Sequence, residues 1–166
     1  KNAISFIAGI NHQAWLLKIS DAAGNDLYPM IKERSLSGEY TEKMKWDLVR
    51  HDVMHRFGYY NTESSEHTAE YSPYYIKSKY PELIEKFRIP LDEYPRRCEL
   101  QIAEWQKLRE KVLSVDVEHE RSREFGSRII NAVVNNEAYC IHGNVLNQGY
   151  ITNLPNNACV EVPCLV

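Results

Sequence analysis

The hydrophobic pattern predicts strands towards both ends of the chain. Residues 4–10 and 14–19 are two apolar runs of strand length, separated by Asn11, His12 and Gln13. Residues 138–145 and 158–166 are further strand candidates, joined by a loop rich in asparagine and glycine. This spacing leaves a long central region with a different periodicity.

The central region predicts helices. Apolar residues recur at intervals of three and four in residues 41–57, and Gly58 suits the position after a helix end. The longest helical pattern covers residues 91–115, and another covers residues 119–136 with Ser122 as its N-cap. Residues 26–40 allow one short helix. Together with the strands, these segments predict a mixed α+β fold.

Composition narrows the functional classes. Of the 166 residues, 43% are hydrophobic and 26% are charged, as in a folded globular protein. The net charge of -3 argues against a nucleic-acid binder, whose surface would be strongly basic. No apolar run approaches the ~18 residues of a membrane span. The four cysteines are too few for a disulfide scaffold and favour free thiols in the cytoplasm.

The ends of the chain suggest a part of a longer polypeptide. The chain begins without methionine in a predicted strand, and it stops within the apolar alternation NACVEVPCLV. We therefore expect a fragment.

Residues 62–75 hold an unusual density of proton donors and acceptors. A structural interpretation is a capped helix start, with Thr62 or Ser64 as the cap. A capping motif does not require a histidine or a run of tyrosines. Those side chains suit a ligand with many hydroxyls, because aromatic faces pack on C–H surfaces and carboxylates accept hydrogen bonds from hydroxyl groups. The candidates for such a pocket are Glu63, Glu66, His67, Glu70 and Tyr71.

Asn11 and His12 lie between two strand segments and allow two interpretations. His12 is a hydrogen-bonded structural residue, or it is a metal ligand beside an asparagine that binds a substrate hydroxyl. The loop of residues 143–157, which includes Asn144 and Asn147, is either a long hairpin connection or the wall of a pocket.

His51 and His55 share a helix face at the spacing found in zinc proteases. Asp52 follows His51, where that motif has the longer glutamate as its general base. An exposed helix face therefore explains this pair more simply than a zinc site.

Three segments resemble a known family in the same order and with similar spacing. AGINHQAWLLKI, RFGYYNTESSEHTAEYSPYYIK with IPLDEYPRRCELQIAEWQK, and IHGNVLNQGYITNLPNNACVEVPCLV are similar to α-galactosidases of glycoside hydrolase family 4. The resemblance covers nearly the whole chain, and TESSEH is similar to the melibiose-type branch. It implies the C-terminal domain of a lactate/malate-dehydrogenase-like architecture, with mixed helices and antiparallel strands.

The resemblance also implies NAD and Mn2+ as cofactors of the full-length enzyme. In this family NAD+ accepts a hydride from C3 of the sugar, a base removes the C2 proton, and the C1–O bond then breaks. Metal binding would fall to His12 and substrate binding to Asn11. The proton acceptor would be one of Tyr71, Tyr74 and Tyr75, of which Tyr71 is preferred. Substrate-binding residues would further include Glu66, His67, Glu70 and Asn144.

This assignment requires His12 and Tyr71 to face a common cavity. It leaves the cofactor-binding residues unidentified, because no G-x-G-x-x-G is present and the family's N-terminal Rossmann domain is absent from residues 1–166. We expect these residues to form the substrate and metal side of the enzyme and to be inactive alone.

Other functions remain open. The sugar could differ, as in an α-glucosidase or α-glucuronidase of the same family, or the fragment could only bind carbohydrate or assemble. Strand edges left unpaired in the fragment favour association with another chain, so we expect a homo-oligomer.

Overall fold

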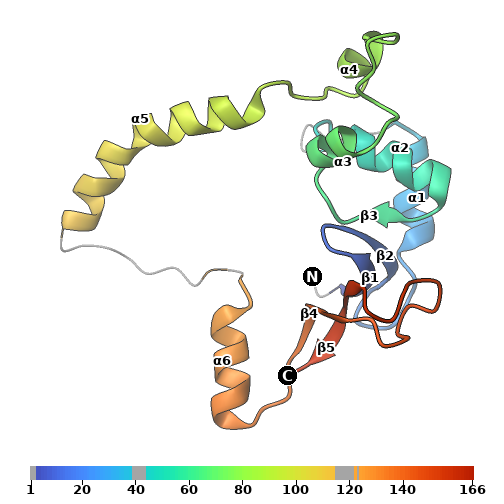
Figure 1. Ribbon diagram of the computed structural model, residues 1–166, viewed down its shortest axis with the longest axis vertical. Coiled ribbons are helices and arrows are strands. Elements are labelled where there is room, and N and C mark those ends of the chain that lie inside the picture. Colours follow the sequence, from blue (N-terminus) through green and yellow to red (C-terminus); the bar gives the residue numbers. More distant parts are fainter. Residues whose placement is uncertain (1–2, 39–43, 115–121, 123) are drawn as a thin grey trace.

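The computed structural model describes residues 3–38, 44–114, 122 and 124–166, and a five-stranded sheet forms its centre. The strand order is β3-β2-β1-β5-β4, and every neighbouring pair is antiparallel (Figure 1). The strands are β1 (Ile4–Ile10), β2 (Gln13–Ser20), β3 (Tyr60–Asn61), β4 (Cys140–Leu146) and β5 (Cys159–Leu165). The predicted α+β class with antiparallel strands is confirmed.

The hairpin β1–β2 turns at Asn11 and His12, as the sequence predicts. Close pairing next to the turn requires a glycine, because a Cβ atom on Gly9 would lie 2.8 Å from Ala14 Cα. Gly9 has φ +149°, and Ala14 is fully buried. The hairpin therefore presents Asn11 and His12 at its tip.

Four helices follow the hairpin, and the last three of them contribute to the core beside β2. The four helices are α1 (Tyr28–Leu36), α2 (Leu48–Phe57), α3 (Ser65–Tyr71) and α4 (Glu82–Lys86). Ala69 of α3 packs with apolar side chains of α2 and of the segment around α4, and Trp15 of β2 packs against this cluster. Its buried members are Val49, Val53, Ala69, Tyr75, Phe87 and Ile89. The core thus fixes α3 against α2.

The helix predicted over residues 41–57 begins later than expected. Residues 44–46 form a turn, Asp47 has non-helical φ and ψ of -110° and 19°, and residues 41–43 lie outside the described structure. The Asp47 amide donates to Met44 O at 2.9 Å, which closes this turn instead of a helical one. The end is as predicted, because Gly58 caps α2 at φ 83° and donates its amide to Met54 O.

The helices α5 (Glu93–Leu113) and α6 (Gly126–Asn135) form an arm that extends away from the sheet (Figure 1). No residue of α5 is buried, and Ala132 is the buried residue of α6. Both helices nevertheless carry large apolar side chains, which are exposed: Tyr94, Leu100, Ile102, Trp105, Leu108, Val112, Leu113, Ile130, Val133 and Val134.

The predicted N-cap of the second arm helix is wrong. Ser122 precedes the helix by several residues, and Phe125 occupies the cap position, where its carbonyl accepts the amides of Arg128 and Ile129. Of the earlier residues predicted as helix, 119–121 and 123 lie outside the described structure.

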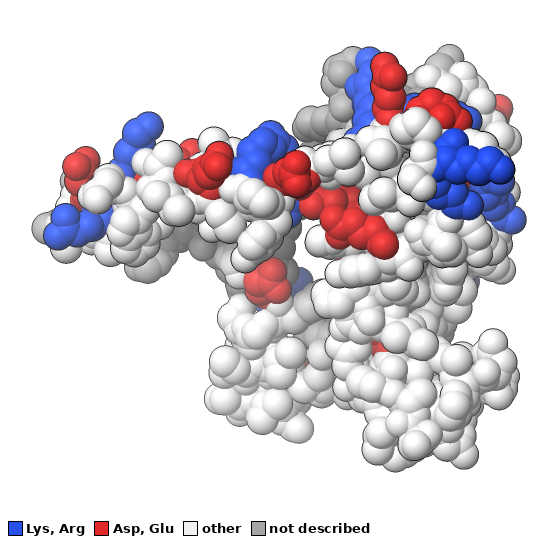
Figure 2. Space-filling view, turned by 45° about the horizontal axis from the view of Figure 1, so that its top comes forward, with Lys and Arg blue, Asp and Glu red and all other residues white. Residues whose placement is uncertain are grey.

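Charged side chains are concentrated on one part of the surface. Figure 2 shows lysine, arginine, aspartate and glutamate side chains over the arm helix α5 and the helical region, whereas the lower part of the same face carries few. None of the helices in the described ranges is long and apolar enough to cross a membrane.

Candidate active site

The hairpin tip lies beside the start of α3 because β3 pairs with β2. Trp15 pairs with Asn61 and Leu16 with Tyr60, and the chain then runs from β3 directly into α3. The amide of Thr62 continues this contact by donating to Ala14 O at 2.9 Å. Sheet pairing therefore brings together two segments that are about fifty residues apart in the sequence.

Asn61 links the hairpin to α3. Its side chain is 2% exposed, and its Nδ2 donates to Gln13 Oε1 at 3.2 Å and to Ala14 O at 3.3 Å. Its Oδ1 accepts from the Glu63 amide and from Thr68 Oγ1, both at 3.0 Å. Both polar atoms of the Asn61 side chain are therefore hydrogen-bonded, as is usual for buried polar groups. These bonds join the hairpin to the start of α3.

His12 is the exposed side chain of this arrangement. Its imidazole is 77% exposed, and its Nδ1 lies 3.4 Å from Oε2 of Glu63, a carboxylate that is only 12% exposed. Asn11 is exposed beside it at the tip, and the peptide between the two residues is cis. Both residues are accessible to a ligand.

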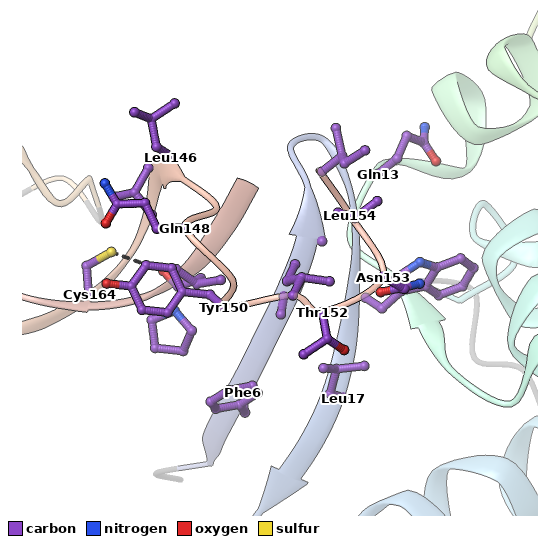
Figure 3. A pocket seen from close by; sticks show the side chains of 18 of the residues that line it. Phe6, Gln13, Leu17, Leu146, Gln148, Tyr150, Thr152, Asn153, Leu154 and Cys164 are labelled. Atoms are coloured by element: carbon purple, nitrogen blue, oxygen red, sulfur yellow. Dashed lines mark hydrogen bonds between the residues drawn. The ribbon is translucent and has the colours of Figure 1, made fainter. Parts of the chain in front are cut away.

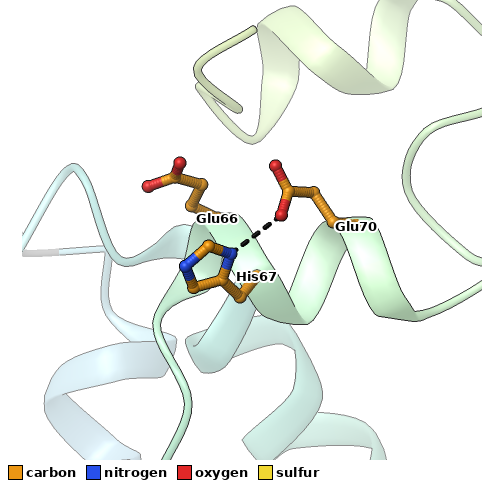
Figure 4. Close-up of side chains that lie close together, drawn as sticks. All are labelled: Glu66, His67 and Glu70. Carbon is orange, nitrogen blue, oxygen red and sulfur yellow. Dashed lines mark hydrogen bonds and ion pairs between the residues drawn. The ribbon is translucent and has the colours of Figure 1, made fainter. Parts of the chain in front are cut away.

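Glu66, His67 and Glu70 project from α3 as a compact group (Figure 4). One ligand atom of each lies within 4.8 Å of the other two, so the group could hold a cation. His67 Nδ1 is 2.8 Å from Glu70 Oε2, and this hydrogen bond is the main cause that raises the pKa of His67. Glu66 pairs with Arg97 of α5 at 2.7 Å.

The Glu66 group and His12 are neighbours through Glu63. The charge of Glu63, together with those of Glu70 and Glu66, also raises the pKa of His67. Glu63 thus lies 3.4 Å from His12 and also affects His67 by its charge. That these residues form one substrate site stays a prediction.

The three candidate tyrosines have different surroundings. Tyr71 ends α3, is 68% exposed and stacks on His67 with ring centroids 5.6 Å apart. Tyr74 is also exposed. Tyr75 is a core residue that donates to Asp52 Oδ2 at 2.9 Å, and burial followed by that hydrogen bond raises its pKa. Tyr71 and Tyr74 are thus better placed than Tyr75 to accept a proton from a ligand.

Asn144 and Asn147 have different surroundings, because Asn144 belongs to β4 and Asn147 begins the loop after it. Asn147 is fully buried, and its side chain bonds to the backbone of Ile151, Leu154 and Pro155, so it shapes the loop. Asn144 is exposed on β4, opposite Glu161 of β5. Because β4 and β3 are opposite edges of the sheet, the structure does not bring Asn144 to the α3 group. Its substrate contact stays a prediction.

A large groove lies between the hairpin and this loop (Figure 3). It has a volume of about 1540 Å³, is mainly apolar, and reaches Gly9, Ile10 and Gln13 on either side of the hairpin tip. The loop contributes Gln148, Tyr150, Ile151, Thr152, Asn153 and Leu154. The interpretation of this loop as a pocket wall therefore agrees with the structure.

The expected common cavity of His12 and Tyr71 stays a prediction. Neither residue belongs to the described lining of the groove or of a smaller cavity of about 310 Å³, which Tyr74 and Tyr75 line. Both side chains are exposed on the surface instead.

The pair His51 and His55 does not share an exposed helix face as predicted, because His51 is buried and only His55 is exposed. His51 Nδ1 and His55 Nε2 both lie 2.8 Å from Ser35 Oγ of α1. His51 is buried, and burial is the main cause that lowers its pKa. The two rings therefore tie α2 to α1.

Sequence reasoning included Glu63 in the dense polar cluster, but it missed Asn61, which joins this cluster to the hairpin. Both lie in the polar run Asn61-Thr62-Glu63, directly before the N-cap Ser64, whose Oγ accepts from the His67 amide at 3.2 Å. The run was visible in the sequence, but its partners on the hairpin follow only from the β2–β3 pairing.

Comparisons with known proteins identify the family of the chain. Residues 7–166 match the family 4 glycosyl hydrolase C-terminal domain. An α-galactosidase of Bacillus subtilis is 56% identical over 160 residues, and one of Rhizobium meliloti is 32% identical over 184 residues. Each alignment covers 96% of this chain but only 36% and 34% of the relative, so the chain spans about a third of these relatives' length.

Solved structures show the same fold at lower identity. A Bacillus subtilis protein described as a glucosidase, lplD, is 23% identical with a TM-score of 0.77, over 98% of this chain and 39% of its own. A 6-phospho-α-glucosidase from gut microorganisms, solved in complex with NAD and Mn2+, is 20% identical with a TM-score of 0.58, over the same shares of the two chains. With the domain match spanning residues 7–166, the chain belongs to glycosyl hydrolase family 4, as its C-terminal domain.

Proposed function

We propose that residues 1–166 are the substrate and metal side of an NAD- and Mn2+-dependent α-galactosidase that cleaves α-galactosides of the melibiose and raffinose type. The observation that carries the proposal is the 56% identity to an α-galactosidase across 96% of the chain. The accessible His12 beside the polar face of α3 supports it.

The residues present fit one part of a Mn2+ site. Neutral imidazole is a common metal ligand, and His12 is exposed with only its Nδ1 directed at a carboxylate. We propose that His12 supplies one ligand and that the other ligands come from a preceding part of a longer protein.

The NAD site also belongs to that preceding part. This sequence contains no glycine-rich dinucleotide loop, so we assign no cofactor contact to its residues. When bound, NAD+ supplies a hydride acceptor and Mn2+ a Lewis acid.

The chain's own residues would then act on the sugar. Tyr71 is the proposed acceptor of the C2 proton, because its hydroxyl is accessible at the end of α3. Glu66, His67 and Glu70 would bind sugar hydroxyls through their exposed acceptors and donors. Asn11 would bind a hydroxyl next to His12, and Asn144 would contact the substrate from β4.

We further propose a cytoplasmic homo-oligomer. All four cysteines are free thiols, as in proteins of reducing compartments. Large apolar side chains are exposed along both α5 and α6, and exposed apolar surfaces often mark sites of protein–protein association.

An α-glucosidase is the second candidate function. It is favoured by the fold likeness to a protein described as a glucosidase and to a 6-phospho-α-glucosidase. An α-glucuronidase of the same family is the third sugar specificity to compare.

A panel of nitrophenyl glycosides given to the longer protein with NAD+ and Mn2+ tests these proposals. We expect turnover of the α-galactoside to exceed that of the α-glucoside and α-glucuronide. Preference for either of the others would reject the sugar assignment, and galactose binding without any turnover would indicate a carbohydrate-binding module.

A further inference from the structure

Glu63 occupies a fixed position between β3 and α3. Its amide donates to Oδ1 of the buried Asn61 at 3.0 Å, and its own Oε1 accepts from the Ser64 amide at 2.8 Å. The second carboxylate oxygen, Oε2, lies 3.4 Å from His12 Nδ1, which is within ion-pair distance. The carboxylate is largely buried although the imidazole is not.

The backbone of His12 is held by the same short segment. Thr62 Oγ1 donates to His12 O at 3.2 Å and to Ala14 O at 3.1 Å. Asn61 Nδ2 donates to Gln13 Oε1. Both the main chain and the ring of His12 therefore take their position from residues 61–63.

His67 does not compete for this carboxylate as a hydrogen-bond partner in the described contacts. Its Nδ1 lies 2.8 Å from Glu70 Oε2, so each imidazole has a carboxylate of its own. The two pairs also differ in exposure, since the carboxylate of Glu70 is 43% exposed and that of Glu63 is 12% exposed.

We propose that Glu63 is a positioning residue for His12. Its carboxylate accepts a hydrogen bond from the Nδ1–H group of His12, which keeps the Nε2 lone pair free for a metal ion. The inference rests on the proposed function, in which His12 is a metal ligand. Histidine ligands commonly donate their other ring proton to a carboxylate, which fixes the tautomer and raises the basicity of the ligating nitrogen.

The tautomer of His12 can be measured without metal, cofactor or substrate. Long-range ¹H–¹⁵N correlation spectra of the longer protein, labelled with ¹⁵N-histidine and recorded at a pH where the ring is neutral, report which nitrogen carries the proton. We expect the proton of His12 on Nδ1. In Glu63→Ala the tautomer of His12 that is protonated on Nε2 should become the major one. Glu63→Gln should retain the tautomer protonated on Nδ1, because the amide oxygen of glutamine also accepts a hydrogen bond.

Two controls separate this effect from misfolding. The exposed Glu82→Ala should leave the His12 tautomer unchanged. The ring signals of the buried His51, which lies on α2, should be unchanged in every variant that is correctly folded. A His12 protonated on Nε2 in the wild type, or a tautomer that is the same in Glu63→Ala, would overturn the inference.

Added Mn2+ separates this inference from the proposed function. Paramagnetic broadening should affect the His12 ring first, and Glu63→Ala should need about tenfold more Mn2+ for equal broadening. If the wild-type His12 ring is not broadened, the metal role is rejected together with the proposed function. If it is broadened equally in both proteins, Glu63 does not position the ligand.

Discussion

At the residue scale, the buried Asn61 side chain joins the hairpin to the start of α3 through four hydrogen bonds. Glu66, His67, Glu70 and Tyr71 were visible in the sequence, because they are crowded into one turn-rich stretch. Asn61 was not, because its importance comes from hydrogen bonds to residues 13 and 14, which the sequence places almost fifty positions away.

Asn61→Ala should lower the free energy of unfolding by about 2–4 kcal/mol, because the change leaves buried partners of the amide unsatisfied. Urea denaturation measures this. Asn157→Ala, at an exposed asparagine of the loop before β5, should change stability by less than about 0.5 kcal/mol. Equal effects of the two substitutions would contradict the role of Asn61.

The raised pKa of His67 gives a prediction with a definite sign. Its protonated form is favoured in the folded state, so the stabilisation is complete below the ordinary histidine pKa of 6.5 and is lost as the pH rises through the higher folded pKa. Glu70→Gln should lower the pKa of His67 in NMR spectra. It should also destabilise the protein more at about pH 5.5 than at about pH 8.5. A pKa unchanged by the substitution would show that Glu70 is not the cause.

At the element scale, periodicity predicted the long elements and missed the short ones. The strand Ile4–Ile10 and the end of α2 at Gly58 agree with expectation, because alternation and a C-terminal glycine are local signals. The two-residue strand β3 and the helix α4 are too short to have a period of their own. β3 is nevertheless the element that joins the hairpin to α3, so the site could not be assembled from the sequence alone.

Gly58→Ala tests the local signal at the end of α2. A Cβ atom there meets no neighbour within 4 Å, so the cost comes from φ 83° alone and should be about 1–2 kcal/mol in thermal or urea unfolding. Gly126→Ala is the matched control, since its Cβ also meets nothing and its φ is not positive. A control variant that loses as much stability as Gly58→Ala would contradict this explanation.

At the scale of the whole molecule, the arm of α5 and α6 is what the sequence described least well. Its amphipathic pattern predicted helices correctly, but it also implied an apolar side that packs, and in this chain that side is exposed. Sequence periodicity indicates which face of a helix is apolar and packs, but it does not identify the surface against which that face packs.

The proposed homo-oligomer can be tested on α6. Ile130→Lys with Val133→Lys should reduce the mass measured by light scattering to that of one chain, because charges on the exposed apolar side oppose its burial. Asn135→Lys, on the polar side of the same helix, should leave the mass unchanged. A single-chain mass for the unmodified protein would reject self-association.

The central claim is that His12 and the polar face of α3 form the substrate and metal side of a cofactor-dependent glycosidase. The most direct measurement is hydrolysis of a nitrophenyl α-galactoside by the longer protein, with NAD+ and Mn2+ supplied together, separately or not at all, and with His12→Ala in parallel. We predict turnover only with both cofactors, and a loss of Mn2+-dependent turnover in His12→Ala. Full activity without NAD+ and Mn2+, or in the variant, would contradict the account.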